Sequence, residues 1–133
     1  MHPNDLDVIF NARALAEMLP EERSDSFFEA LLGDAGEGAY TIALTFQGQT
    51  RHHLQFHLEL RRRPQKCLVC NLTYGLPAVF RRHPVIDLKG LVADMGSRLA
   101  GQAQIKGWDL GSTEEVSADL HRIPLIIHVT PAS

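Results

Sequence analysis

Cysteine is scarce in this sequence, and long apolar runs are missing. Only two cysteines occur among 133 residues, which is too few for the disulfide framework of a small secreted protein. The longest apolar runs, such as 125–127, are far shorter than the ~20 residues that span a bilayer. No basic stretch followed by an apolar run marks a secretory signal at the start. These absences predict a cytoplasmic protein without membrane contact.

The composition is that of a globular protein, but the charge is unevenly placed. Hydrophobic residues make up 44% and charged residues 22%, which predicts a single domain over residues 1–133. Nine acidic and two basic residues give residues 1–50 a charge of −7, whereas eight basic and two acidic residues give residues 51–90 a charge of +6. These segments can pair internally, or the basic one can steer an anionic ligand. The net charge of −3 argues against nucleic acid as a partner.

Helix-like and strand-like patterns divide the chain. Apolar residues at helical spacing predict a helix that Pro20 closes, a second that Gly33 ends, and a third over 87–99 that Asp87 caps. Strict alternation predicts an antiparallel hairpin, and residues 112–121 fit either a capped helix or a strand, with strand favoured. The extended segments are 40–46, 54–60, one beginning near Lys66, 104–110 and 123–129.

Together these patterns predict an α+β fold. We expect two N-terminal helices, then an antiparallel sheet of about five strands, with the long 87–99 helix packed on its apolar face. An edge strand such as 123–129 would allow a homodimer.

A metal site is one interpretation of Cys67, Cys70 and His83. Their spacing resembles the first three ligands of a Cys2His2 zinc finger, and zinc needs four. No His or Cys follows at the right distance, so Asp87, His57 or water would complete the shell. If residues 66–74 form a regular strand, however, the two thiols lie on opposite faces, and Cys70 is a buried small hydrophobe.

A thiol redox pair is the second interpretation of Cys67 and Cys70. Such pairs usually begin a helix, where the dipole lowers the thiol pKa. The residues after Cys70 do not have a helical pattern, so this interpretation has less support.

Two further pairs are candidate binding residues. His53 and His57 lie on the polar face of the second predicted strand, where a metal could bridge them with Cys67, although such side chains are commonly just solvated. Arg81 and Arg82 could hold an anion through bidentate hydrogen bonds, or could be solvated on a loop. Nucleotide-binding loops, nucleophile elbows and metalloprotease motifs are missing.

The stretch Lys66-Cys-Leu-Val-Cys-Asn-Leu-Thr-Tyr-Gly-Leu-Pro-Ala-Val-Phe-Arg-Arg-His-Pro-Val-Ile86 resembles a family of small uncharacterised bacterial proteins. Some of them carry the label pancreas/duodenum homeobox protein. The chain lacks the basic third helix of a homeodomain, so the label has no support in the residues. The resemblance implies a bacterial cytoplasmic protein and lends no catalytic residues.

These observations favour a non-enzymatic binding or interaction module that uses the basic 61–83 segment. Its partner would be an anionic small molecule or a protein. A zinc protein and a thiol redox protein stay open as alternatives.

Overall fold

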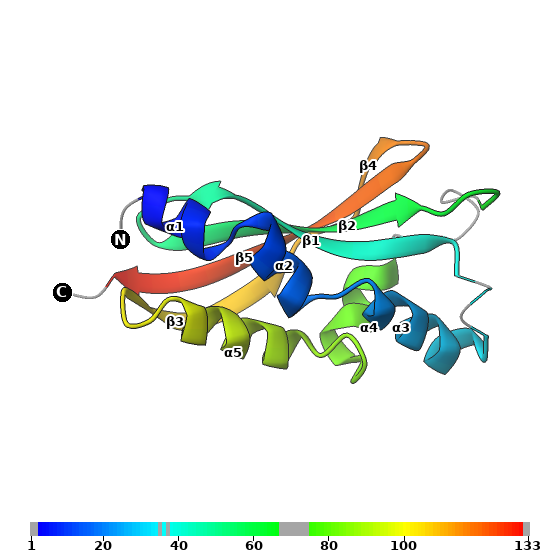
Figure 1. Ribbon diagram of the computed structural model, residues 1–133, viewed down its shortest axis with the longest axis horizontal. Coiled ribbons are helices and arrows are strands. Elements are labelled where there is room, and N and C mark those ends of the chain that lie inside the picture. The colour runs from blue at the N-terminus through cyan, green and yellow to red at the C-terminus, as the bar shows by residue number, and fades with distance from the viewer. Residues whose placement is uncertain (1–2, 35, 37, 67–74, 132–133) are drawn as a thin grey trace.

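Helices precede, interrupt and cover an antiparallel sheet. The protein is described by a computed structural model covering residues 3–34, 36, 38–66 and 75–131 (Figure 1). The helices are α1 (Pro3–Ile9), α2 (Ala12–Met18), α3 (Glu22–Leu32), α4 (Leu76–Arg82) and α5 (Leu88–Arg98). The strands are β1 (Tyr40–Gln49), β2 (His53–Arg62), β3 (Ala103–Leu110), β4 (Glu114–Ser117) and β5 (Leu120–Pro131).

The first predicted helix is broken in two at Asn11. The side chain of Asn11 accepts a hydrogen bond from the Ala14 N–H at 2.8 Å and donates one to the Val8 carbonyl at 2.8 Å. Asn11 therefore caps the start of α2 and also bonds to the end of α1. Such local side-chain bonds to the backbone compete with a continuous helix. The second predicted helix corresponds to α3, which ends at Gly33 with a φ of 82°.

The predicted α+β class with an antiparallel sheet is confirmed. Strands β1 and β2 form the expected hairpin, with Ile42 opposite Leu60 and Leu44 opposite Leu58. The strand order is β1-β2-β5-β3, and β4 also pairs with β5. Residues 114–117 are thus a strand, which decides the ambiguity of 112–121.

The prediction that 123–129 forms an edge strand is wrong. Strand β5 lies between β2 on one side and β3 with β4 on the other. Its alternate residues are fully buried because both neighbours and the helices surround it, and the two edges of the sheet are instead β1 and β3 with β4.

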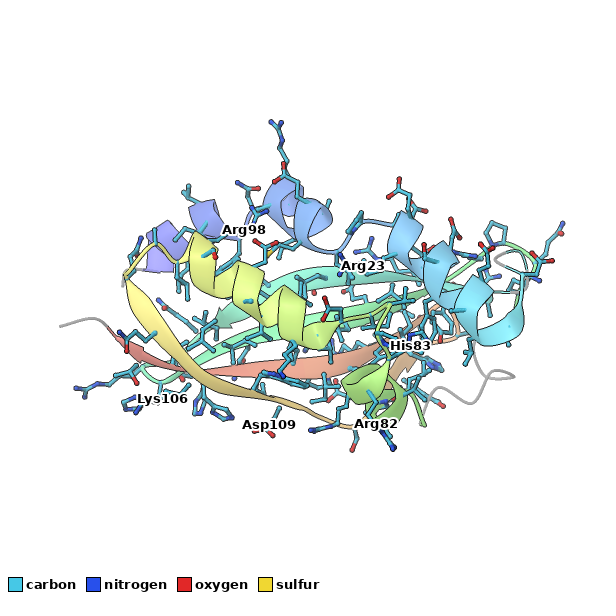
Figure 2. The ribbon with its side chains drawn as sticks, turned by 90° about the horizontal axis from the view of Figure 1, so that it is seen from below. Arg23, Arg82, His83, Arg98, Lys106 and Asp109 are labelled. Atoms are coloured by element: carbon cyan, nitrogen blue, oxygen red, sulfur yellow. The ribbon has the colours of Figure 1, made fainter. Side chains whose placement is uncertain are left out.

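The helices cover one face of the sheet and one of its edges. Helices α4 and α5 lie on one side of the sheet, and α1, α2 and α3 lie along the edge strand β1, which all three contact (Figures 1 and 2). Asp87 caps α5 as predicted, accepting from the Gly90 N–H at 3.1 Å. The largest fully buried side chains form this core and are Phe27, Phe56, Phe80, Leu6, Ile42, Leu54, Leu58, Leu60, Ile86, Met95 and Leu99.

The opposite face of the sheet, called the open face below, is covered by none of the helices that the structure describes (Figure 1). Strand alternation places Thr41, Ala43 and Thr45 of β1 there, next to His57 of β2 and Pro124 of β5. These residues are half-buried rather than fully exposed. The predicted extended segment that begins near Lys66 lies mostly outside the described residues.

Candidate functional site

A groove of about 690 Å³ runs between helix α2 and the edge strand β1. Its lining comes from α2, the start of α3, five consecutive residues of β1 and the end of β2. The lining residues are Ala12, Leu15, Ala16, Leu19, Glu21, Asp25, Thr41, Ile42, Ala43, Leu44, Thr45, Arg61, Arg62, Arg63 and Pro64.

The middle of the groove is lined by small and apolar side chains. Ala12 and Ala16 are four residues apart and therefore lie on one side of α2, where both are exposed. Thr41, Ala43 and Thr45 alternate along β1 and form the side of the groove that faces the open side of the sheet. Short side chains on both elements leave the volume that a ligand could fill.

Helix α3 fixes the backbone of β1 at this groove. The hydroxyl of Ser24, which is fully buried, accepts a hydrogen bond from the Ile42 N–H at 2.8 Å. That N–H points away from β2, because it bonds to a helix instead of to the neighbouring strand. Ser24 thus satisfies an edge donor that would otherwise be buried without a partner.

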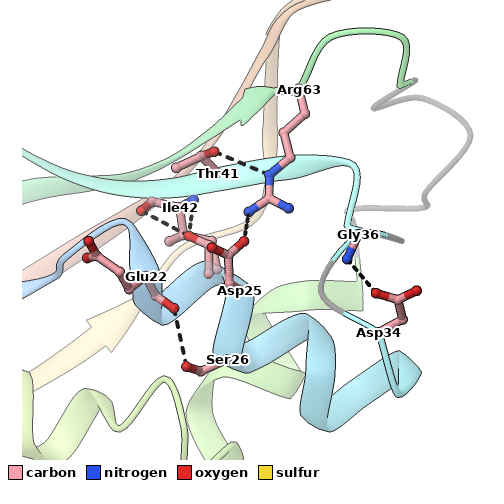
Figure 3. Close-up of polar contacts among 9 residues, drawn as sticks. Glu22, Asp25, Ser26, Asp34, Gly36, Thr41, Ile42 and Arg63 are labelled. Atoms are coloured by element: carbon pink, nitrogen blue, oxygen red, sulfur yellow. Dashed lines mark hydrogen bonds and ion pairs between the residues drawn. The ribbon is translucent and has the colours of Figure 1, made fainter.

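Arg63 closes one end of the groove. Its Nη2 lies 2.6 Å from Asp25 Oδ1 on α3, and its Nε donates to Thr41 Oγ1 at 3.4 Å (Figure 3). Its guanidinium carbon also lies 5.5 Å from the centre of the Phe28 ring. Here the basic segment pairs with the acidic N-terminal segment, as internal charge complementarity predicts.

Arg61 and Arg62 are the more accessible arginines of the groove. Arg61 pairs with Glu59 at 2.8 Å and Arg62 pairs with Asp119 at 2.5 Å. Their side chains are 55% and 36% exposed. Arg61 donates one hydrogen bond to Glu59 through Nε and a second through Nη2. Within the described residues, its Nη1 is therefore available to solvent or to a ligand.

The predicted binding residues His53 and His57 share the open face of β2. His57 lies opposite Thr45 of the groove on one side and Pro124 on the other. Burial lowers the pKa of His57, and the nearby positive charge of Arg122 lowers it further, while Glu114 and Glu59 act in the opposite direction. The neutral imidazole is therefore favoured beside the groove.

Residues four apart on a strand are about 13 Å apart at the usual rise per residue. His53 and His57 therefore lie too far apart to bind one metal ion, which needs nitrogen ligands at ~2 Å. The interpretation in which a metal bridges these two histidines is not compatible with the regular strand that the structure shows.

Arg81 and Arg82 lie at the other edge of the sheet, on α4. Arg81 donates to the Leu110 carbonyl of β3 at 3.1 Å and lies 5.8 Å from the Trp108 ring centre. Arg82 is exposed (Figure 2). The described arginines of the basic 61–83 segment thus lie on two separate surfaces, since Arg61 to Arg63 line the groove beside β1 and Arg81 contacts β3.

Of the predicted metal ligands, Cys67 and Cys70 lie outside the described residues. The ring of His83 packs against Phe27, with centres 4.8 Å apart, and its Nδ1 accepts from the Val85 N–H at 3.2 Å. In the described part of the chain, no three His, Cys, Asp or Glu side chains are grouped to hold a metal. The zinc and redox interpretations stay predictions.

The groove was not predicted from the sequence, although two of its signals are visible there. Ala12 and Ala16 put small residues on the outer side of a helix, and Thr41-Ile-Ala43-Leu-Thr45 alternates small polar-face residues with core residues. Neither signal shows that the helix and the strand lie side by side.

Comparison with known proteins gave no relative. The chain matches no protein-family model, no curated protein and no solved structure. The resemblance to small bacterial proteins therefore stays a prediction. Among the helices that the structure describes, none combines the length and the apolar character needed to cross a membrane.

Proposed function

We propose that this protein is a non-enzymatic binding module whose ligand lies in the groove between α2 and β1. The observation that supports the proposal most is the groove itself, at about 690 Å³. Small-molecule sites in proteins usually have volumes of ~300–1,000 Å³, with apolar linings and a few polar groups that orient the ligand. The groove fits this description.

The ligand that we propose is a small organic anion with an apolar body. The apolar body would lie against Ala16 and Ala43, where both elements present short side chains. The anionic end would lie at Arg61, whose guanidinium is half exposed and keeps donors beyond those that Glu59 uses. Arginine suits carboxylate and phosphate because its planar donors can bind them bidentately.

The charged groups of the lining also support binding rather than catalysis. Asp25 is held in an ion pair by Arg63, and Arg62 is held by Asp119. These pairs are suited to fixing the shape and charge of the groove. A cytoplasmic location belongs to the same proposal, because two cysteines are too few for the disulfide framework of a small secreted protein.

Octanoate is a suitable probe, because it joins an apolar chain to a carboxylate. Isothermal titration calorimetry should detect its binding, and the neutral analogue octanamide should bind less tightly. Arg61→Ala should weaken octanoate binding by ~10-fold or more, since a hydrogen bond to a charged group contributes ~1.5–3 kcal/mol. Ala16→Trp should block the groove.

Matched controls separate the groove from the rest of the surface. Ala93→Trp places the same large side chain at an exposed position of α5 and should leave binding unchanged. The double substitution of Arg81 and Arg82 by Ala should also leave it unchanged. If that double variant loses binding while Arg61→Ala does not, the anion site is on α4 and the groove proposal is wrong.

A further inference from the structure

We propose that His53 and His128 form a two-histidine site for a divalent transition-metal ion on the open face of the sheet. The two residues are direct partners across strands β2 and β5. Their ring centres are 4.9 Å apart and the rings are steeply inclined, at 70°. Cross-strand partners on one face are the closest side-chain neighbours that an antiparallel sheet offers.

Within the described residues, each ring has one nitrogen bonded to an oxygen, and the other nitrogen is left for a ligand. The Nε2 of His128 lies 2.7 Å from Asp109 Oδ2. The Nδ1 of His53 lies 3.3 Å from Thr50 Oγ1. If these nitrogens carry the hydrogens, the remaining nitrogens, Nδ1 of His128 and Nε2 of His53, have free lone pairs, which is the form of imidazole that binds metals.

Asp109 gives His128 the environment of a metal-binding histidine. Metal-ligating histidines generally donate their second N–H to a carboxylate or carbonyl, which fixes the ring and raises the basicity of the ligating nitrogen. Asp109 lies on β3 (Figure 2), and β5 lies between β3 and the strand β2 that carries His53. Three neighbouring strands thus contribute to one arrangement of carboxylate, histidine and histidine.

The site is open to solvent, so water can supply the other ligands. The side chain of His128 is 39% exposed and that of Asp109 is 64% exposed. Because no group of three protein ligands is present among the described residues, the protein would provide two nitrogens and leave positions open. Imidazole nitrogen suits Zn²⁺, Ni²⁺ and Cu²⁺, and open positions are typical of exchangeable rather than structural sites.

The two histidines of this site do not line the groove. Of the described residues, His57, which lies beside the groove, and His83, which packs against Phe27, take no part in it. A purely structural role is the competing explanation, because the His128–Asp109 pair also joins β5 to β3. Metal binding and folding must therefore be measured separately.

Ni²⁺ titrated into the full chain by isothermal calorimetry is the direct test. A background with Cys67→Ser and Cys70→Ser removes thiol ligands. One ion per chain should bind, and His53→Gln and His128→Gln should each abolish this binding. Asp109→Asn should weaken it by ~10-fold, the lower end of what loss of an outer-shell carboxylate costs.

His52→Gln is the matched control, since His52 precedes His53 but belongs to the turn rather than to β2. It should leave Ni²⁺ affinity unchanged. Circular dichroism without metal would confirm that each variant is folded. If His128→Gln does not fold, NMR of the thiol-free chain is the alternative test. Paramagnetic Ni²⁺ should then broaden the ring signals of His53 and His128. No broadening, or binding kept by His53→Gln, would overturn the proposal.

Discussion

Ser24 joins helix α3 to the edge of the sheet through one hydroxyl. It is fully buried and accepts from the Ile42 N–H at 2.8 Å. A sequence pattern does not reveal this role, because a serine in a helix is most often exposed or bonded to its own helix. Its partner is 18 residues away in the chain, so only the packing of α3 against β1 shows it.

Ser24→Ala should lower the free energy of unfolding by about 1–3 kcal/mol, because it leaves a buried N–H without a partner. The measurement is chemical denaturation at neutral pH. Ser26→Ala is the control, since Ser26 is exposed and its hydroxyl donates to the Glu22 carbonyl of its own helix. Ser26→Ala should change the free energy of unfolding by no more than about 0.5 kcal/mol. Equal effects of the two variants would contradict the role of Ser24.

His57 should make stability depend on pH. Burial and Arg122 lower the pKa of folded His57 below its ordinary value of 6.5, so the unfolded chain binds this proton more readily. The free energy of unfolding should therefore decrease as the pH falls through about 6.5. His57→Gln should remove this part of the pH dependence. The free energy of unfolding of both proteins would be measured by chemical denaturation at several pH values between 5 and 8. The same dependence of this free energy on pH in both proteins would contradict the expectation.

At the scale of elements, the strongest periodic patterns predicted the fold correctly. The hairpin of β1 and β2 follows from strict alternation, and the cap of α5 follows from Asp87. The break at Asn11 could not be predicted, because the apolar spacing continues across it and a side-chain bond decides the outcome. The interior position of β5 also could not, since periodicity does not say which strands are neighbours.

Asp87→Ala should lower the free energy of unfolding by about 1 kcal/mol, the usual cost of losing an N-cap. Asp87 has a φ of 49°, in the left-handed region, which Asn tolerates better than Ala does. Asp87→Asn keeps a capping oxygen and should therefore stay close to the original stability. Thermal unfolding of the two variants checks this. Gly90 belongs to the same cap, since a Cβ there would overlap the Asp87 carboxylate.

At the scale of the whole molecule, the edge strands β1 and β3 both carry features that protect a sheet edge. Helices α2 and α3 lie along β1, and Ser24 occupies its Ile42 donor. On β3 the register shifts between Ile105 and Gly107, Lys106 is exposed, and Arg81 binds the Leu110 carbonyl. Bulges, lysines and covering helices are the usual protections against edge pairing.

The candidate site could be predicted only in part, because a sequence pattern does not show which elements are neighbours. The run of basic residues Arg61, Arg62 and Arg63 is evident in the sequence, and their pairing with acidic residues was one of the two outcomes expected for it. The groove beside them was not visible, because it needs Ala16 and Ala43, 27 positions apart in the sequence, on adjacent elements. The cross-strand pair of His53 and His128 likewise depends on the register of β2 with β5.

The most direct test of the groove as the ligand site is an NMR titration of the ¹⁵N-labelled chain with octanoate. The proposed function predicts that the amide signals that shift belong to Ala16, Thr41, Ala43 and the Arg61 end of β2. The shifts should saturate together, and Arg61→Ala should reduce them. Shifts confined to the residues around Arg82, or no shift at Ala16 and Ala43 at saturating octanoate, would contradict it.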